Sequence, residues 1–91
     1  MVLNRQHTLD ERQKKLKFRA WHRGTREMDL ILGSFADAYV FGFDDQSLDA
    51  FEQLLSCPDP DLYDWKCGLS QPDASENTDV MKLYLQHKYV A

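Results

Sequence analysis

The chain of 91 residues is long enough for one modest hydrophobic core and short for two domains. Its hydrophobic content of 43% and aromatic content of 12% are typical of a folded protein, and its seven Gly and Pro residues are too few for a disordered chain. No apolar run approaches the ~20 residues of a membrane span, and residues 1–9 do not read as a targeting segment. We therefore predict one domain, cytoplasmic and without membrane insertion.

The net charge of −4 is unevenly distributed. Residues 1–27 carry a net charge of +5, and residues 28–91 carry −9. A basic end of this kind can steer a protein to an acidic partner surface, or the two ends can attract each other across the fold. The sequence favours neither interpretation over the other.

The first predicted helix spans residues 8–22, after a flexible segment of residues 1–7. Thr8 and Glu11 have the spacing of a capping box, in which each side chain bonds a free amide at the helix start. Apolar residues at helical spacing form one narrow stripe: Leu9, Leu16 and Ala20. Phe18 and Trp21 project away from this stripe, so they are either covered by a later helix or exposed as an aromatic patch for a partner.

The second predicted helix, residues 25–39, follows a glycine corner. Gly24 is suited to the position after the end of the first helix, because glycine takes a positive φ without steric cost. Thr25 can then cap the second helix. The following residues recur at three- and four-residue spacing and predict a broad buried face: Met28, Ile31, Leu32, Phe35 and Tyr39.

Three further helices complete an all-α fold, a compact five-helix bundle in a single domain. They span residues 45–55, capped by Asp44 or Asp45, residues 60–67, and residues 74–89, opened by Asp73. For the fourth helix we expect Asp59 as the N-cap and Gly68 as the stop. Residues 40–43 read as a packed apolar loop.

The sequence lacks the usual marks of a catalytic or ligand site. It has no glycine-rich phosphate or dinucleotide motif, and no serine stands in a nucleophile-elbow setting. His7, His22 and His87 do not have metal-ligand spacing, and His87 reads as a histidine at the edge of the core. Cys57 and Cys67 form an isolated pair that we interpret as buried or idle thiols. We expect no catalytic residue, no cofactor of its own and no metal.

The corner between the first two helices is the strongest candidate for a binding site. Four charged residues within seven positions are unusual at a tight corner that touches nothing: Arg23, Arg26, Glu27 and Asp29. We assign the corner to partner binding together with its neighbours Arg19, Trp21, His22 and Gly24. An ion pair between Arg23 and Glu27 would contribute only tenths of a kcal/mol. Nucleic acid is disfavoured as the partner, because the helix after the corner is apolar and slightly acidic.

The residues 23–27, Arg-Gly-Thr-Arg-Glu, resemble the RGxxE motif of the assembly factors that promote covalent FAD attachment to the flavoprotein subunit of succinate dehydrogenase. Residues 30–36 resemble the second helix of that family, and residues 59–65 resemble its later aromatic segment. His22 departs from the basic residue that many relatives carry there. The resemblance covers nearly the whole chain and implies a five-helix bundle.

The resemblance also implies a function. The chain would act as a chaperone, with no turnover of its own, on a flavoprotein that carries both the FAD and the histidine that becomes attached to it. Arg23, Gly24 and Glu27 would dock near the flavin site, and mutation of Arg23 or Glu27 would leave stability nearly unchanged. Fumarate reductase flavoprotein is a further possible client, and we expect a bacterial protein that is monomeric when free. The alternative is a generic helical adaptor or inhibitor that uses the same corner.

Overall fold

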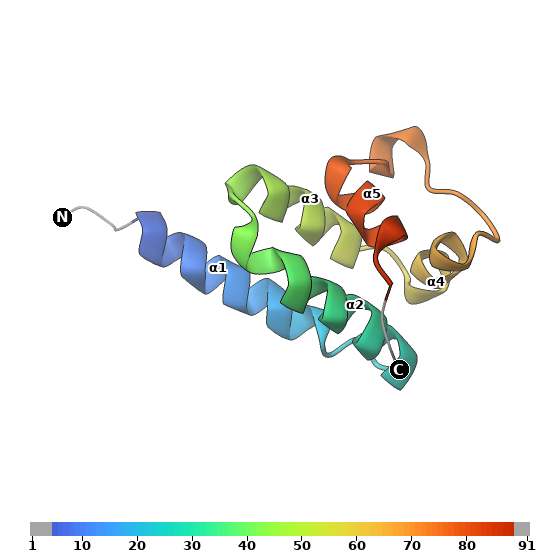
Figure 1. Cartoon of the computed structure of the whole chain (residues 1–91), viewed down its shortest axis with the longest axis horizontal. Helices are drawn as coiled ribbons and strands as arrows, with labels where there is room; N and C mark the ends of the chain where they lie inside the picture. Colours follow the sequence, from blue (N-terminus) through green and yellow to red (C-terminus); the bar gives the residue numbers. More distant parts are fainter. Residues whose placement is uncertain (1–4, 89–91) are drawn as a thin grey trace.

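Five α-helices and two 3₁₀ turns form one bundle in the part of the chain that the structure describes (Figure 1). This computed structural model describes the backbone of residues 5–88 and the side chains of residues 9–88. In chain order the elements are α1 (Arg5–Ala20), α2 (Arg26–Tyr39), η1 (Val40–Gly42), α3 (Asp45–Leu55), α4 (Asp59–Cys67), η2 (Ala74–Glu76) and α5 (Asp79–Gln86). The all-α, five-helix prediction is confirmed.

Helix α1 packs against both α2 and α3, and α5 packs against α3 and α4. In Figure 1, α1 and α2 run side by side, and α4 lies at the end of the molecule remote from the start of α1. Phe35 of α2 is fully buried at the centre of the core. Its ring centroid lies 5.0 to 6.4 Å from those of five surrounding residues: Tyr39, Phe43, Phe51, Tyr84 and His87. Residues from α2, α3 and α5 therefore share one aromatic core.

The buried face predicted for α2 is confirmed except at Tyr39, which is half-buried, and α3 buries a face of the same kind. Both helices bury the residues that recur at three- and four-residue spacing: Met28, Ile31, Leu32, Phe35, Leu48, Phe51, Leu54 and Leu55. Each helix begins at a side-chain cap, because Thr25 Oγ1 accepts from Met28 N and the Asp44 carboxylate accepts from Ser47 N. The apolar periodicity and the caps act together to fix these two helices.

The ends of α1 differ from the prediction. The helix already includes residues 5–7, so the predicted helix start and capping box at Thr8 are wrong; residues 1–4 of the segment expected to be flexible lie outside the described part. Arg5 and Gln6 are good helix formers, and no glycine or proline interrupts the run before Thr8. At the other end α1 stops at Ala20 rather than residue 22. Trp21 and Arg23 leave the helix because their side chains contact other elements.

The segment after α4 also differs from the prediction. Instead of one helix over residues 74–89, a 3₁₀ turn is followed by a shorter helix, α5, that starts at Asp79 and ends at Gln86. Asp73 makes no side-chain cap, and Thr78 is the N-cap, accepting from Met81 N. Residues 40–42, expected as loop, form the 3₁₀ turn η1. Residue 89, the last of the predicted helix, lies outside the described residues.

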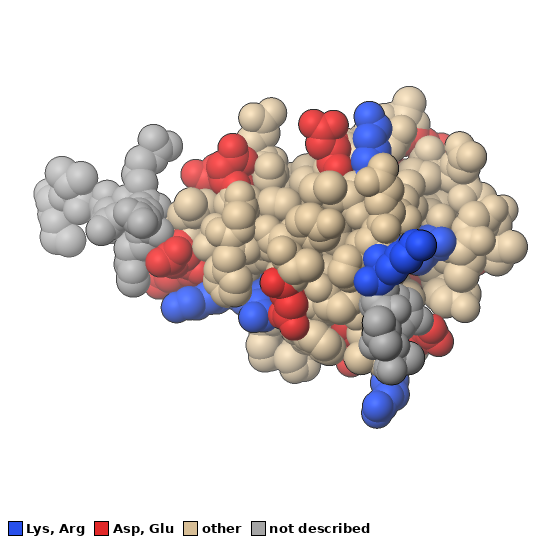
Figure 2. Space-filling view, viewed as in Figure 1, with Lys and Arg blue, Asp and Glu red and all other residues tan. Residues whose placement is uncertain are grey.

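Several basic residues of α1 form ion pairs with carboxylates of other helices. Arg12 of α1 lies within 2.5 to 3.5 Å of carboxylate oxygens of α3, on Asp45, Asp49 and Glu52. Arg19 and Lys17 also reach carboxylates of α3 and α2, respectively. Figure 2 shows side chains of both signs spread around one face rather than gathered into a single-sign patch. Attraction between the two ends of the sequence therefore explains much of the basic first helix.

The described helices are all too short or too polar to cross a membrane.

Candidate functional site

Arg23 is held inside the molecule. Its side chain is 12% exposed, and its Nε and Nη2 atoms donate to Asp59 Oδ1 at 2.9 and 2.7 Å. Nη1 donates to the Leu55 carbonyl at 2.7 Å, and Nη2 also reaches the Cys57 carbonyl at 3.2 Å. The guanidinium thus joins the corner to the end of α3 and the start of α4. Its removal will affect stability, contrary to the prediction that mutation of Arg23 leaves stability unchanged.

Asp59 is the carboxylate that sequence reasoning placed in the wrong role. We expected it to cap α4, but it is the first residue of that helix, and Pro58 stands in the N-cap position without a side-chain bond. The Asp59 carboxylate turns to Arg23 instead. The end of α4 follows the prediction, because Gly68 takes a left-handed conformation with φ of 79°.

The rest of the corner is fixed from α2. Asp29 accepts a hydrogen bond from the backbone N–H of Arg23 at 2.6 Å, so it ties the loop to the first turn of the helix. Gly24 has a φ of 123°, which confirms the positive φ but not the expected position, because α1 ends four residues earlier. A side chain at Gly24 would meet open space, so the backbone angle alone demands glycine there.

Glu27 and Arg26 are the corner residues that face outward. Both are exposed, and Glu27 lies in the first turn of α2, where a negative charge is favoured. Glu27 lines a shallow depression of about 440 Å³, here called the corner groove, with Thr25, Met28, Asp59, Pro60 and Tyr63. The pKa of the exposed Tyr63 phenol is raised, mainly by the Cys67 thiol and also by the Glu27 carboxylate. The two segments that resemble the family motifs therefore form one surface.

Trp21 links the corner to α2 and is one of the two aromatic residues that the sequence left as either covered or exposed. Its indole lies on the backbone of α2 at Gly33, where a Cβ atom would come within 2.1 Å of the ring. The indole N–H donates to Asp37 Oδ1 at 3.2 Å. Trp21 is half-buried, so a later helix covers one side of it. Gly33, which the sequence did not single out, permits this close approach.

Phe18, in contrast, is 62% exposed. Its ring stacks on His22 with centroids 3.9 Å apart, and the His22 ring bonds the Phe18 carbonyl through Nδ1 at 2.7 Å. A second depression of about 370 Å³, here called the aromatic groove, is lined by Lys14, Lys17, Phe18, Trp21, His22 and Phe41. Of the two aromatic residues whose fate the sequence left open, Phe18 is exposed and Trp21 is half-buried. Arg19 turns away toward Glu52 of α3.

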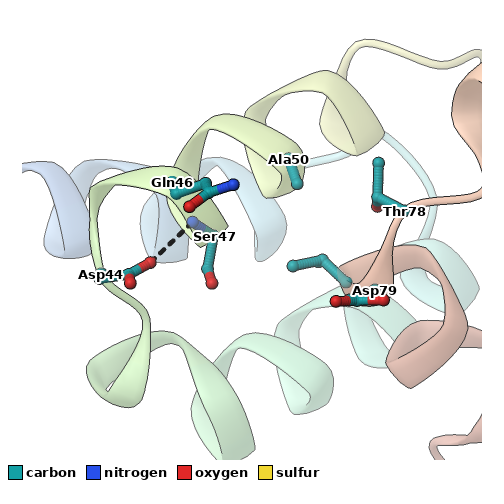
Figure 3. Close-up of a pocket in the computed structure, with 7 residues that line it drawn as sticks. Asp44, Gln46, Ser47, Ala50, Thr78 and Asp79 are labelled. Atoms are coloured by element: carbon teal, nitrogen blue, oxygen red, sulfur yellow. Dashed lines mark hydrogen bonds between the residues drawn. The ribbon is translucent and has the colours of Figure 1, made fainter.

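A third depression, shown in Figure 3, lies between the starts of α3 and α5. Its volume is about 290 Å³, and its labelled residues include Asp44, Ser47, Thr78 and Asp79. The dashed line marks the Asp44 carboxylate accepting from Ser47 N, and Thr78 similarly caps α5. Asp44 and Thr78 cap the helices whose starts they precede, so these two polar groups are explained by the fold.

The cysteines do not form a reactive pair. Both thiols are free, with Cys57 buried and Cys67 exposed. Burial and the neighbouring Glu76 carboxylate raise the pKa of the Cys57 thiol to about 11, which keeps it protonated and unreactive. Within the described residues, His, Cys, Asp and Glu do not gather into a group of three or more that could hold a metal ion.

Comparison with known proteins agrees with this geometry. Residues 14–88 match the model of the Sdh5 family, described as flavinator of succinate dehydrogenase. The chain belongs to the Sdh5 family. The match covers the corner, the groove beside it, the second half of α1 and the whole of α2 to α5. The resemblance noted from residues 23–36 and 59–65 is therefore confirmed.

Curated relatives of this Sdh5-family chain come from bacteria and eukaryotes. It is 43% identical over 60 residues to the FAD assembly factor SdhE of Acetobacter pasteurianus, covering 66% of this chain and 55% of the relative. It is 34% identical over 80 residues to succinate dehydrogenase assembly factor 2, mitochondrial, of Debaryomyces hansenii, covering 84% and 56%. The protein of the same name from Dictyostelium discoideum is 33% identical over 79 residues, covering 87% and 56%. The chain spans about half the length of these relatives.

Proposed function

We propose that this chain binds the flavoprotein subunit of succinate dehydrogenase and promotes the covalent attachment of FAD to it. Family membership supports an assembly role for succinate dehydrogenase. The observation that carries the proposal is the corner itself: Arg23 and Asp29 fix its backbone, Glu27 lines the corner groove with residues of α4, and Arg26 is exposed next to Glu27 in the chain. A preorganised charged surface of this kind suits docking onto a partner whose own groups react.

The roles of the motif residues differ in this proposal. Glu27 and Arg26 make charged contacts with the flavoprotein, and Gly24 lets the backbone approach closely. Arg23 and Asp29 act as positioning residues, because their polar atoms hold the loop and α4 in place. Trp21, His22 and Arg19 flank the corner on the α1 side. The flavin and the histidine that it joins belong to the partner, so the chain supplies fixed geometry and charge rather than turnover.

The proposal places the chain in a bacterial cytoplasm, on the strength of the relative from Acetobacter pasteurianus. Fumarate reductase flavoprotein is a second candidate client, and the free chain is taken as a monomer. The competing function is a helical adaptor or inhibitor that uses the same corner.

A flavin-attachment assay tests the proposal. The purified flavoprotein subunit lacking covalent flavin is mixed with FAD and this chain, and bound flavin is read as in-gel fluorescence. We expect Glu27→Gln to slow attachment roughly 10-fold or more, because a charged docking contact is lost. Its stability should fall by less than about 1 kcal/mol, since the side chain is exposed at a helix start.

The matched control is Asp79→Asn, which also removes one exposed carboxylate from the first turn of a helix, α5. It should support attachment as well as the unmodified chain does. If the chain binds the flavoprotein but leaves its covalent flavin unchanged or reduced, the adaptor or inhibitor function replaces the proposed one.

A further inference from the structure

The aromatic groove is a second apolar surface that the fold does not use. Phe18 and Phe41, 62% and 53% exposed, come from α1 and η1 and meet at this groove. Leaving two phenylalanine side chains in water forgoes burial energy that a small domain needs, so a binding role accounts for them better than the stability of the monomer. The groove of about 370 Å³ is large enough to take one or two apolar side chains of a partner.

The groove is preorganised by contacts around its edge. The rings of His22 and Phe18 stack at 3.9 Å, and Lys17 Nζ lies 5.0 Å from the centre of the Phe41 ring. Trp21 is held at its base by Asp37, which also pairs with Lys17 at 3.2 Å. Side chains that are already ordered lose little entropy when a partner binds them.

The chemistry of the rim indicates the kind of occupant. Lys14 and Lys17 both line the groove; Lys17 already pairs with Asp37, so an apolar segment that enters meets positive charge at the edge mainly from Lys14. A segment with carboxylates beside its apolar side chains complements this arrangement.

The position of the groove indicates which protein supplies that segment. Trp21 and His22 line the groove and directly precede Arg23 and Gly24 in the chain. A partner docked at the corner therefore already lies beside the groove. One continuous interface would join the two, with the corner near the reacting flavin and the aromatic groove as an anchor away from it.

We propose that the aromatic groove is a second docking site for the flavoprotein, occupied by a segment of that subunit that carries apolar side chains flanked by Asp or Glu. This inference rests on the proposed function, since it names a further contact with the same partner. The groove supplies affinity, whereas the corner supplies the geometry needed for flavin attachment. The two sites should therefore differ in what their mutation changes.

Binding of the purified flavoprotein to full-length variants of this chain, measured by calorimetry, tests the inference. Phe18→Ser and Phe41→Ser should each weaken binding roughly 10-fold, as expected for the loss of an aromatic anchor. Lys14→Glu should weaken binding most at low salt, because it reverses a charge at the rim. Thermal unfolding should be nearly unchanged in all three, since these side chains are exposed.

The matched control is Leu69→Ser, which removes an apolar side chain that is 74% exposed and does not line the groove. It should bind the flavoprotein as the unmodified chain does. When the variant chain is present at a concentration that saturates the flavoprotein, Phe18→Ser should support full flavin attachment, whereas Glu27→Gln should not. That separation is specific to an anchoring role.

Other results would overturn the inference. If Phe18→Ser and Phe41→Ser bind the flavoprotein with unchanged affinity while the unmodified chain promotes attachment, the groove proposal fails and the proposed function stands. If light scattering shows that the free chain dimerises and Phe18→Ser makes it monomeric without affecting flavoprotein binding, the occupant is a second copy. If the unmodified chain does not bind the flavoprotein, both proposals fail.

Discussion

Replacing Asp59 by Ala should destabilise the domain through Arg23. The change removes both hydrogen bonds that Arg23 makes to Asp59 Oδ1, at 2.9 and 2.7 Å, and leaves the guanidinium with the Leu55 and Cys57 carbonyls. Breaking a fully buried pair costs about 3–5 kcal/mol. Because the two side chains retain 12% and 25% exposure, water can partly replace the carboxylate, and we expect a loss of about 2 kcal/mol.

For a domain of this size, about 2 kcal/mol corresponds to a fall in melting temperature of roughly 8–16 °C. Thermal unfolding followed by circular dichroism measures it. The matched control is Asp61→Ala, which removes another carboxylate from the first turn of α4 and thus reproduces the loss of a favourable charge at the helix start. Asp61 is exposed, so its removal should cost only tenths of a kcal/mol.

A double-mutant cycle completes the test. Once Arg23 is replaced by Ala, the further change Asp59→Ala should cost no more than Asp61→Ala does, because its partner is already gone. The reasoning is refuted if Asp59→Ala and Asp61→Ala have the same melting temperature. It is also refuted if the effects of the Arg23 and Asp59 changes simply add, since the two residues would then not act as one unit.

Two further predictions concern the sides of the corner and the core. Gly33→Ala should lower stability by about 1–3 kcal/mol and shift the Trp21 fluorescence to the red, because the added Cβ displaces the indole; unchanged emission in a variant with Trp65 replaced by Phe would contradict this. The pKa of His87 is lowered from 6.5 by burial and by Lys66, so folding favours the neutral ring. The free energy of unfolding should therefore fall as the pH drops below 6.5. Urea unfolding over the same pH range should show a smaller fall for His87→Gln than for the unmodified chain. Equal falls in the two proteins would exclude His87 as the cause.

Local patterns in the sequence determined most of the fold. The three- and four-residue spacing of apolar residues fixed the buried faces of α2 and α3, and Thr25 and Asp44 fixed where they begin. These features depend on neighbours within one or two turns, which is why they can be read from a single chain. The same holds for Gly68, whose positive φ ends α4.

The helix starts predicted from the sequence were wrong where two residues could each have been the N-cap or where a cap motif lay within a helix. Thr8 and Glu11 have the spacing of a capping box, yet the helix continues through them; Asp73 could open a helix, yet Thr78 does. A cap residue is only a preference of about 1 kcal/mol, so the surrounding residues decide which candidate is used.

The candidate site divides in the same way. The sequence alone located the charged corner at residues 21–29, and it identified the family through residues 23–27 and 59–65. It could not show that Asp59 pairs with Arg23, 36 positions away, nor that Gly33 receives Trp21 and that Phe18 and Phe41 share a groove. Such contacts depend on how the helices pack, and only the tertiary structure decides that Arg23 and Asp29 of the motif hold the corner in place while Glu27 lines the corner groove.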